Sequence, residues 1–124
     1  MNEEFAVWLD NVLKGGLPEG GAAVNFNIYE DGDGDWSIQF ILSSEYDREN
    51  DDWACDELFS SEEDIFEFHL EDEWEKAQEK AVDLISDYLE NGEYRNVLKS
   101  YSAVCTGFVD GALLMLYPDN TAEE

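Results

Sequence analysis

The sequence predicts an α+β fold: an N-terminal helix, an antiparallel β-meander, a long helix and a C-terminal β-hairpin that completes the sheet. Three observations predict it. Apolar residues recur at helical spacing within 3–14 and 72–90, and they alternate with polar residues in two runs between 23 and 42. Near the C-terminus, an Asp-Gly pair separates two apolar runs, which is a strong hairpin signal. The 124 residues, 44% of them hydrophobic, are expected to form a single domain over 1–124.

The first helix is expected over residues 3–14, E-E-F-A-V-W-L-D-N-V-L-K. Gly15 and Gly16 then end it, and L-P-E-G-G at 17–21 has the composition of a connector. The apolar residues that repeat at helical spacing are Phe5, Trp8, Leu9, Val12 and Leu13.

A β-hairpin is expected next. Val24, Phe26 and Ile28 alternate with polar neighbours, and the run W-S-I-Q-F-I-L alternates again through Trp36, Ile38, Phe40 and Leu42. Between the two runs lies E-D-G-D-G-D-W at 30–36, where Gly32 and Gly34 supply the backbone freedom that a turn needs.

The following segment, 43–63, is strongly acidic, and a short strand is expected near Trp53 to Phe59. D-I-F-E-F-H-L at 64–70 alternates as a strand does, although Phe66, Leu70 and Trp74 also lie at i, i+4 and would suit the start of a helix. We favour the strand.

The long helix is expected from about Asp72 to Glu90, with Asn91-Gly92 closing it through a left-handed C-terminal residue. Its apolar stripe is Trp74, Ala77, Ala81, Ile85, Tyr88 and Leu89. Val109-Asp110-Gly111-Ala112 then marks the turn of the C-terminal hairpin, and residues 118–124 are expected to form a frayed tail.

Net charge limits the possible functions. The chain has 32 acids against 6 bases, a formal net charge of -26. A net charge of about 2 to 8 already keeps a small domain in solution, and a larger excess makes the folded state repel itself. A halophilic composition is a competing explanation, against which the apolar content argues. Direct binding of nucleic acid needs a basic face, so we expect none and expect a basic protein or a cation as partner.

The acids are concentrated in the middle of the chain. Between Glu30 and Glu75 there are 19 acids and one arginine, whereas the remaining 13 acids accompany five bases. If the loops of this region cluster, they form one anionic patch in which Trp36, Tyr46 and Trp53 serve as interface anchors; alternatively, these rings are core residues. The residues expected to bind the partner are Asp31, Asp33, Asp35, Tyr46, Asp47, Glu49, Asp51, Asp52, Trp53 and Asp56.

The alternating aspartates at 31, 33 and 35 resemble the opening of a calcium loop. An EF-hand loop that started at Asp31 would need glycine at its sixth position and glutamate at its twelfth, but Trp36 and Leu42 occupy them. The flanking residues also favour strands over helices. We therefore expect a hairpin turn, with weak cation binding as an alternative, and no dedicated metal or cofactor site.

Catalysis is not expected. The single histidine, His69, shares a strand face with Glu67 if 64–70 is extended, and it is read as a surface residue. Cys105 lies in an apolar strand and is read as packed and inert. Metal ligation by His69 with Glu73 would require both on one helix, and two ligands do not make a site. The chain also lacks the G-x-S-x-G, G-x-x-x-x-G-K and H-E-x-x-H motifs.

The cellular compartment is inferred from features that are missing. No run of about eighteen apolar residues would span a membrane, and the acidic N-terminus M-N-E-E lacks the basic region of a signal peptide. Cys55 and Cys105 show no C-x-x-C spacing, and we favour two buried reduced thiols over a disulfide. We therefore expect a cytoplasmic protein without a membrane partner.

The chain resembles the bacterial immunity proteins that neutralise polymorphic or contact-dependent growth-inhibition toxins. The resemblance is in size, charge and element order over most of the chain, and in three pieces: D-W-A-C-D-E-L-F (52–59), Y-L-E-N-G-E-Y (88–94) and G-F-V-D-G-A-L (107–113). It implies a stoichiometric inhibitor of a cognate toxin domain, often a basic nuclease, with no catalytic residues and no cofactor.

An immunity protein against a basic toxin is accordingly the expected function. Charge reversal at Asp51, Asp52 and Asp56 should slow its association with the toxin. A DNA-mimic inhibitor of a DNA-binding protein uses the same physics and is the first alternative; a weak divalent-cation-binding protein is the second.

Overall fold

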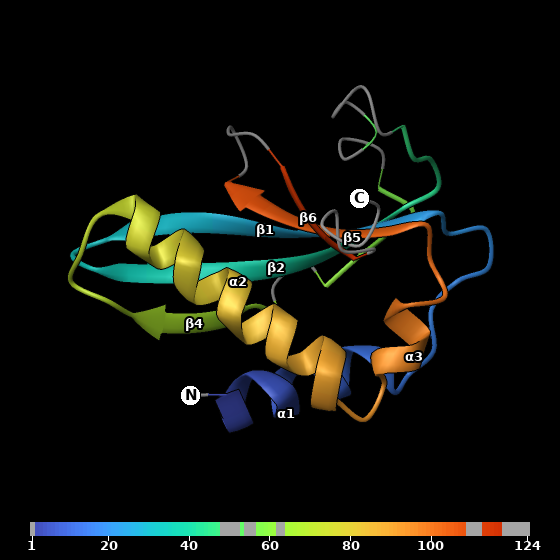
Figure 1. Cartoon of the computed structure of the whole chain (residues 1–124), viewed down its shortest axis with the longest axis horizontal. Coiled ribbons are helices and arrows are strands. Elements are labelled where there is room, and N and C mark those ends of the chain that lie inside the picture. Colours follow the sequence, from blue (N-terminus) through green and yellow to red (C-terminus); the bar gives the residue numbers. More distant parts are fainter. Residues whose placement is uncertain (1, 48–52, 54–56, 62–63, 109–112, 118–124) are drawn as a thin grey trace, which may run out of the picture.

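The computed structural model describes residues 2–47, 53, 57–61, 64–108 and 113–117. It confirms the α+β fold, with helices packed on one face of a sheet (Figure 1). In chain order, the elements are α1 (Asn2–Leu13), β1 (Ala23–Gly32), β2 (Asp35–Ser43), β3 (Phe59–Ser60), β4 (Phe66–His69), α2 (Trp74–Asn91), α3 (Arg95–Leu98), β5 (Ala103–Phe108) and β6 (Leu114–Tyr117).

The sheet is mixed. Its order is β3-β2-β1-β5-β6, and β4 also pairs with β2, so β3 and β4 share one edge. The pairs of the expected meander and of the C-terminal hairpin are antiparallel, whereas β5 joins β1 in parallel. The Asp110-Gly111 pair expected between β5 and β6 lies outside the described residues.

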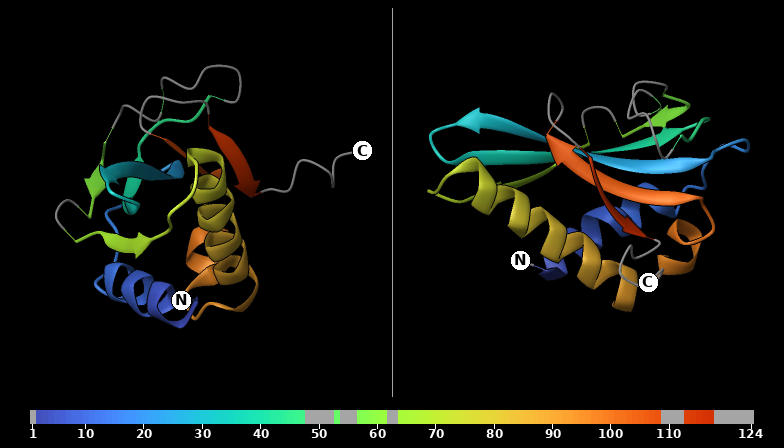
Figure 2. Two further views of the ribbon diagram at one scale, coloured as in Figure 1. Left: turned by 90° about the vertical axis from the view of Figure 1, so that its left-hand side faces the viewer. Right: turned by 45° about the horizontal axis from the view of Figure 1, so that its top comes forward.

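The main core lies between the sheet and the two longer helices, which cover the same face (Figure 2). All five apolar residues expected to face inward from the first helix are buried. Phe5 shows how α1 is held: its ring lies 6.3 Å from that of Phe26 on β1, 5.2 Å from Phe66 on β4 and 6.4 Å from Tyr88 on α2.

The strand expected at 64–70 is confirmed as β4, in which Phe66 and Phe68 are buried and Glu67 and His69 exposed. The short strand expected near Trp53 to Phe59 begins only at Phe59. The long helix begins at Trp74, two residues after its expected start, and Leu84 joins its buried face.

The expected left-handed residue at the end of α2 is wrong. Gly92 has φ -69 and ψ 151, which is extended backbone open to any residue. Glycine is needed there for another reason: a Cβ on Gly92 would lie 2.5 Å from Cε1 of Tyr88. The close approach of the backbone to this ring, and not a positive φ, therefore explains the residue.

The turn between β1 and β2 has the predicted hairpin geometry. Asp33 and Gly34, its two central residues, have φ 55 and 81, and both signs match a type I′ turn, which suits the twist of the flanking strands. The register shifts between Glu30 and Gly32, so Asp31 is the extra residue of a bulge.

A smaller cluster covers part of the other face of the sheet. The ring of Trp53 packs there with Tyr46, at a centroid distance of 5.4 Å, over the small side chains of Ala23 and Ala103. Ser43 donates a hydrogen bond to the Trp53 carbonyl oxygen at 2.8 Å. These contacts leave Trp53 only 5% exposed.

No helix in the described part of the chain is both long enough and apolar enough to cross a membrane. Cys105 is buried in β5, as expected, while Cys55 lies outside the described residues.

Candidate functional site

Carboxylates from two connections and the start of a helix gather at one end of the sheet. The β1–β2 turn and the β4–α2 connection lie side by side there, at the left of Figure 1. We call this surface the acidic end; its residues are Asp31, Asp33, Asp35, His69, Glu71, Asp72, Glu73, Trp74 and Glu75, and all of them are exposed.

Backbone contacts fix the two connections to each other. The Leu70 N–H donates to the Gly34 carbonyl oxygen at 2.8 Å, and the Trp36 indole N–H donates to the Leu70 carbonyl oxygen at 2.9 Å. A Cβ on Gly34 would lie 3.0 Å from Cγ of Glu71 and 3.1 Å from Cε1 of His69. The acidic end is therefore built on ordered backbone, which limits the entropy lost when a partner binds.

His69 links the same two connections through its side chain. Its Nδ1 lies 2.8 Å from Oδ1 of Asp35, and its Nε2 lies 2.9 Å from Oε2 of Glu71. The hydrogen bond to Asp35, followed by that to Glu71, raises the pKa of His69 above its usual 6.5. When the ring is protonated, it donates to both carboxylates, which would otherwise repel each other.

This arrangement does not suit a metal ion. The carboxylates of Asp35 and Glu71 occupy the two ring nitrogens, on different edges of the imidazole, so the three groups do not converge on one point. Glu73 immediately precedes α2 while His69 ends β4, so the pair considered above does not lie on one helix. Among the described residues, no three His, Cys, Asp or Glu side chains are arranged to hold a metal.

Trp74 is the aromatic residue that stands out at the acidic end. It is 53% exposed, at the first position of α2 between Glu73 and Glu75. Its ring lies 5.9 Å from that of Phe108, which in turn lies 5.8 Å from that of the buried Trp36. Ring contacts thus connect this indole to the core and hold it in place. The assignment of Trp74 to the buried stripe of the helix was wrong: its ring packs against Phe108 at the end of β5 but remains half-exposed.

The described members of the expected patch lie at two ends of the molecule. Asp31, Asp33 and Asp35 belong to the acidic end, whereas Tyr46 and Asp47 follow the opposite end of β2. At about 3.3 Å per residue, the nine-residue strand separates its ends by about 26 Å. The expectation that the hairpin loop and the segment after β2 cluster is therefore wrong for these residues. Glu49, Asp51, Asp52 and Asp56 lie outside the described residues.

The expectation that Trp36, Tyr46 and Trp53 serve as interface anchors also needs correction. Trp36 is 2% exposed and faces the main core in phase with Ile38 and Phe40, and Trp53 is buried in the smaller cluster. Neither indole is available on the surface as an anchor, so the alternative that they are core residues holds. Tyr46 is half-buried beside Trp53. Trp74, which the helical spacing placed inside, has the exposure that an anchor needs.

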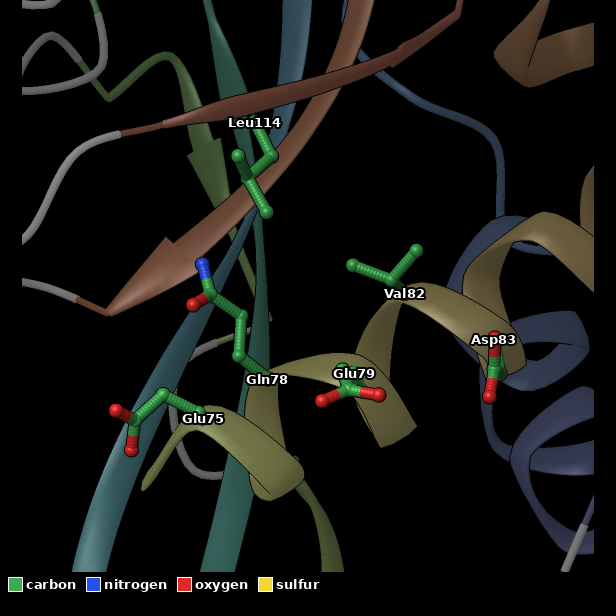
Figure 3. Close-up of a pocket in the computed structure, with 6 residues that line it drawn as sticks. All are labelled: Glu75, Gln78, Glu79, Val82, Asp83 and Leu114. Atoms are coloured by element: carbon green, nitrogen blue, oxygen red, sulfur yellow. The ribbon is translucent and has the colours of Figure 1, made fainter. Parts of the chain in front are cut away.

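A shallow groove begins at the acidic end and runs between α2 and β6 (Figure 3). Val82 and Leu114 supply its apolar surface, while Glu75, Glu79 and Asp83 supply carboxylates from α2; Gln78 also lines it. Its volume is about 180 Å³, below the roughly 300 Å³ at which pockets for small molecules begin. This groove suits side chains of a macromolecule better than a metabolite.

No known protein family, curated protein or solved structure matches this chain. The function has to be argued from the chemistry of the site itself. Exposed carboxylates around a half-exposed indole, on ordered backbone, are suited to contact Lys and Arg side chains of another protein.

Proposed function

We propose that the protein is an immunity protein, which binds a cognate basic toxin domain and blocks its substrate groove. The acidic end is the contact surface in this proposal. The observation that carries it is the exposure of Trp74 in the middle of this set of carboxylates, because buried aromatic anchors surrounded by polar groups dominate the affinity of protein interfaces.

A nuclease is the toxin class that this surface fits. A nuclease must present Lys and Arg where it contacts the phosphates of its substrate. The acidic end offers carboxylates to the same side chains, and the net charge of -26 attracts a basic partner from a distance. Steering of this kind raises association rates toward about 10⁸–10⁹ M⁻¹s⁻¹ at low salt, and rapid capture is what an antidote requires.

The proposal predicts that a secreted protein with a basic domain is encoded beside this chain, and the test uses that domain. Co-expression with that domain should restore growth, and Trp74→Ala should weaken binding by about thirtyfold or more, the effect of losing about 2 kcal/mol at an interface hot spot. Val97→Ala removes an exposed apolar side chain from α3 and is the matched control, which should bind as the wild type does.

Two outcomes oppose the proposal. Growth inhibition that the wild-type protein does not relieve removes the antidote function, and full affinity in Trp74→Ala removes the acidic end as its interface. Similar affinity for several unrelated DNA-binding proteins would favour the DNA-mimic alternative instead.

A further inference from the structure

We propose that the groove between α2 and β6 binds an extended segment of a basic protein, which adds a strand to β6 and points alternate Lys or Arg side chains at α2. This inference rests on the proposed function. It specifies that the basic partner binds this groove as an extended segment.

The first observation is the edge of the sheet. β6 pairs with β5 on one side only and is the last strand of the described sheet. Its sequence is L-M-L-Y, and none of the four residues is fully buried; Leu114 is 42% exposed. Natural sheets usually protect an edge with charges, prolines or bulges within the edge strand. β6 has no charge or proline, although its register on β5 shifts between Met115 and Tyr117, so that Leu116 is the extra residue of a bulge. Its Leu114 end, before the bulge, remains an apolar edge that can pair with another chain.

The second observation is the charge beside this edge. Glu75, Glu79 and Asp83 follow one another at four-residue spacing along α2 and line the groove, in which Gln78 and Val82 lie nearer to Leu114 (Figure 3). Like charges at this spacing destabilise a helix by about 0.2–0.5 kcal/mol per pair. The helix dipole favours Glu75 in the first turn, and Glu79 lies near Lys76, but the residues that line the groove include no base. An incoming cation would supply one.

The spacing of the carboxylates along α2 matches the spacing of same-face side chains along an added strand. Four residues of a helix advance by about 6 Å, and two residues of a strand advance by about 6.6 Å, which is the distance between side chains on the same face. α2 and β6 also run in the same general direction (Figure 2). A strand added to β6 would therefore bring every second side chain to a successive carboxylate.

Lys76 and Lys99 of this chain would not compete strongly with the bases of the partner. Nζ of Lys76 lies 3.6 Å from Oε2 of Glu79, but both side chains are more than half exposed, and such pairs contribute at most about 1 kcal/mol. Lys99 lies over the ring of Tyr117, 5.9 Å from its centroid, at the other end of β6. The alternating bases of the partner therefore belong near Leu114.

A labelled peptide in which lysine alternates with valine tests this inference. Its isomer with contiguous lysines has the same charge, and a third version carries N-methyl groups on alternate amides, which removes backbone pairing. The alternating peptide should bind at least about fivefold more tightly than either. On binding, amide hydrogen exchange should slow within Leu114–Tyr117.

Variants of the protein test whether the peptide binds in the groove. Glu79→Gln with Asp83→Asn should weaken binding of the alternating peptide by at least about fivefold. Glu90→Gln with Glu93→Gln makes the same change in charge outside the groove and should have less than about a twofold effect. Equal binding of the three peptides, equal effects of the two double variants, or unchanged exchange in β6 would each overturn the inference.

The outcomes of these experiments distinguish a failure of this inference from a failure of the proposed function. If the groove variant binds the toxin domain fully while Trp74→Ala does not, the groove fails and the antidote stands. If the wild-type protein does not neutralise the toxin, the function fails, and the exchange of β6 still decides whether the groove accepts a strand.

Discussion

The side chain of His69 both links two segments of the fold and contacts two charged groups. It is the single histidine of the chain, and its ring holds Asp35 of β2 next to Glu71 of the β4–α2 connection. A surface position was expected for it, and the structure confirms that position. Sequence reasoning missed the two carboxylate partners. Asp35 is 34 residues away and becomes a neighbour only through the pairing of β2 with β4. Glu71 is only two residues away but follows the end of the strand that was considered.

The raised pKa of His69 makes a prediction with a definite sign. Because the folded state favours the charged ring, its contribution to stability is fully present below pH 6.5 and is lost as the pH rises through the folded pKa. His69→Gln should therefore lower the denaturation midpoint at about pH 5.5 more than at about pH 8.5.

Titration of this single imidazole by NMR checks the cause directly. The pKa of the wild-type ring should lie above 6.5, and Asp35→Asn should lower it more than Glu71→Gln does, because the bond to Asp35 has the larger effect. A wild-type pKa at or below 6.5 is incompatible with the double hydrogen bond.

At the scale of the elements, the end of α2 depends on one fixed ring. The Tyr88 hydroxyl donates to Oδ1 of Asp10 at 2.6 Å and accepts a hydrogen bond from the Tyr94 N–H at 3.2 Å. Burial, together with the Asp10 carboxylate, raises the pKa of Tyr88 far above its usual value. The ring joins α1, α2 and the start of α3, so it has no room to move away from Gly92.

Gly92→Ala should therefore destabilise the protein. The added methyl group would overlap the Tyr88 ring, and overpacking of this kind costs about 1–3 kcal/mol. Gly15→Ala is the control, because nothing lies within 4 Å of its Cβ position, and it should leave the urea midpoint nearly unchanged. Equal midpoints for the two variants would show that the ring can shift.

The periodicity of apolar residues predicted which helices and strands form. It was less successful for where they end and which strands pair. The alternation in 23–42 and 64–70 identified β1, β2 and β4, since one face of each strand is buried against the helices. The parallel pairing of β5 with β1 could not be predicted from it, because alternation within a strand does not specify its neighbour. Trp74 was assigned to the core for a related reason: helical spacing gives the face of a residue but not how completely its neighbours, here Phe108, cover it.

At the scale of the whole molecule, the described carboxylates from the middle of the chain lie in separate places and not in one patch. The acids between Glu30 and Glu75 were expected to form one patch, but β2 separates the hairpin aspartates from Asp47 by its full length. Glu71, Asp72 and Glu73 join the hairpin aspartates instead, brought there by β4. The resulting acidic end contains an exposed indole, Trp74, that the expected patch did not include.

The central claim is that the acidic end, and not net charge alone, captures the basic partner. Stopped-flow association with the toxin domain tests it most directly. The variant Asp31→Asn, Asp33→Asn, Glu73→Gln is compared with Glu19→Gln, Glu90→Gln, Glu93→Gln, which removes the same charge from exposed sites away from the acidic end.

At low salt, the first variant should associate about tenfold more slowly than the wild type, and the control about twofold more slowly; added salt should reduce the difference. Equal slowing of the two variants would contradict the claim, because it would mean that the partner responds only to total charge.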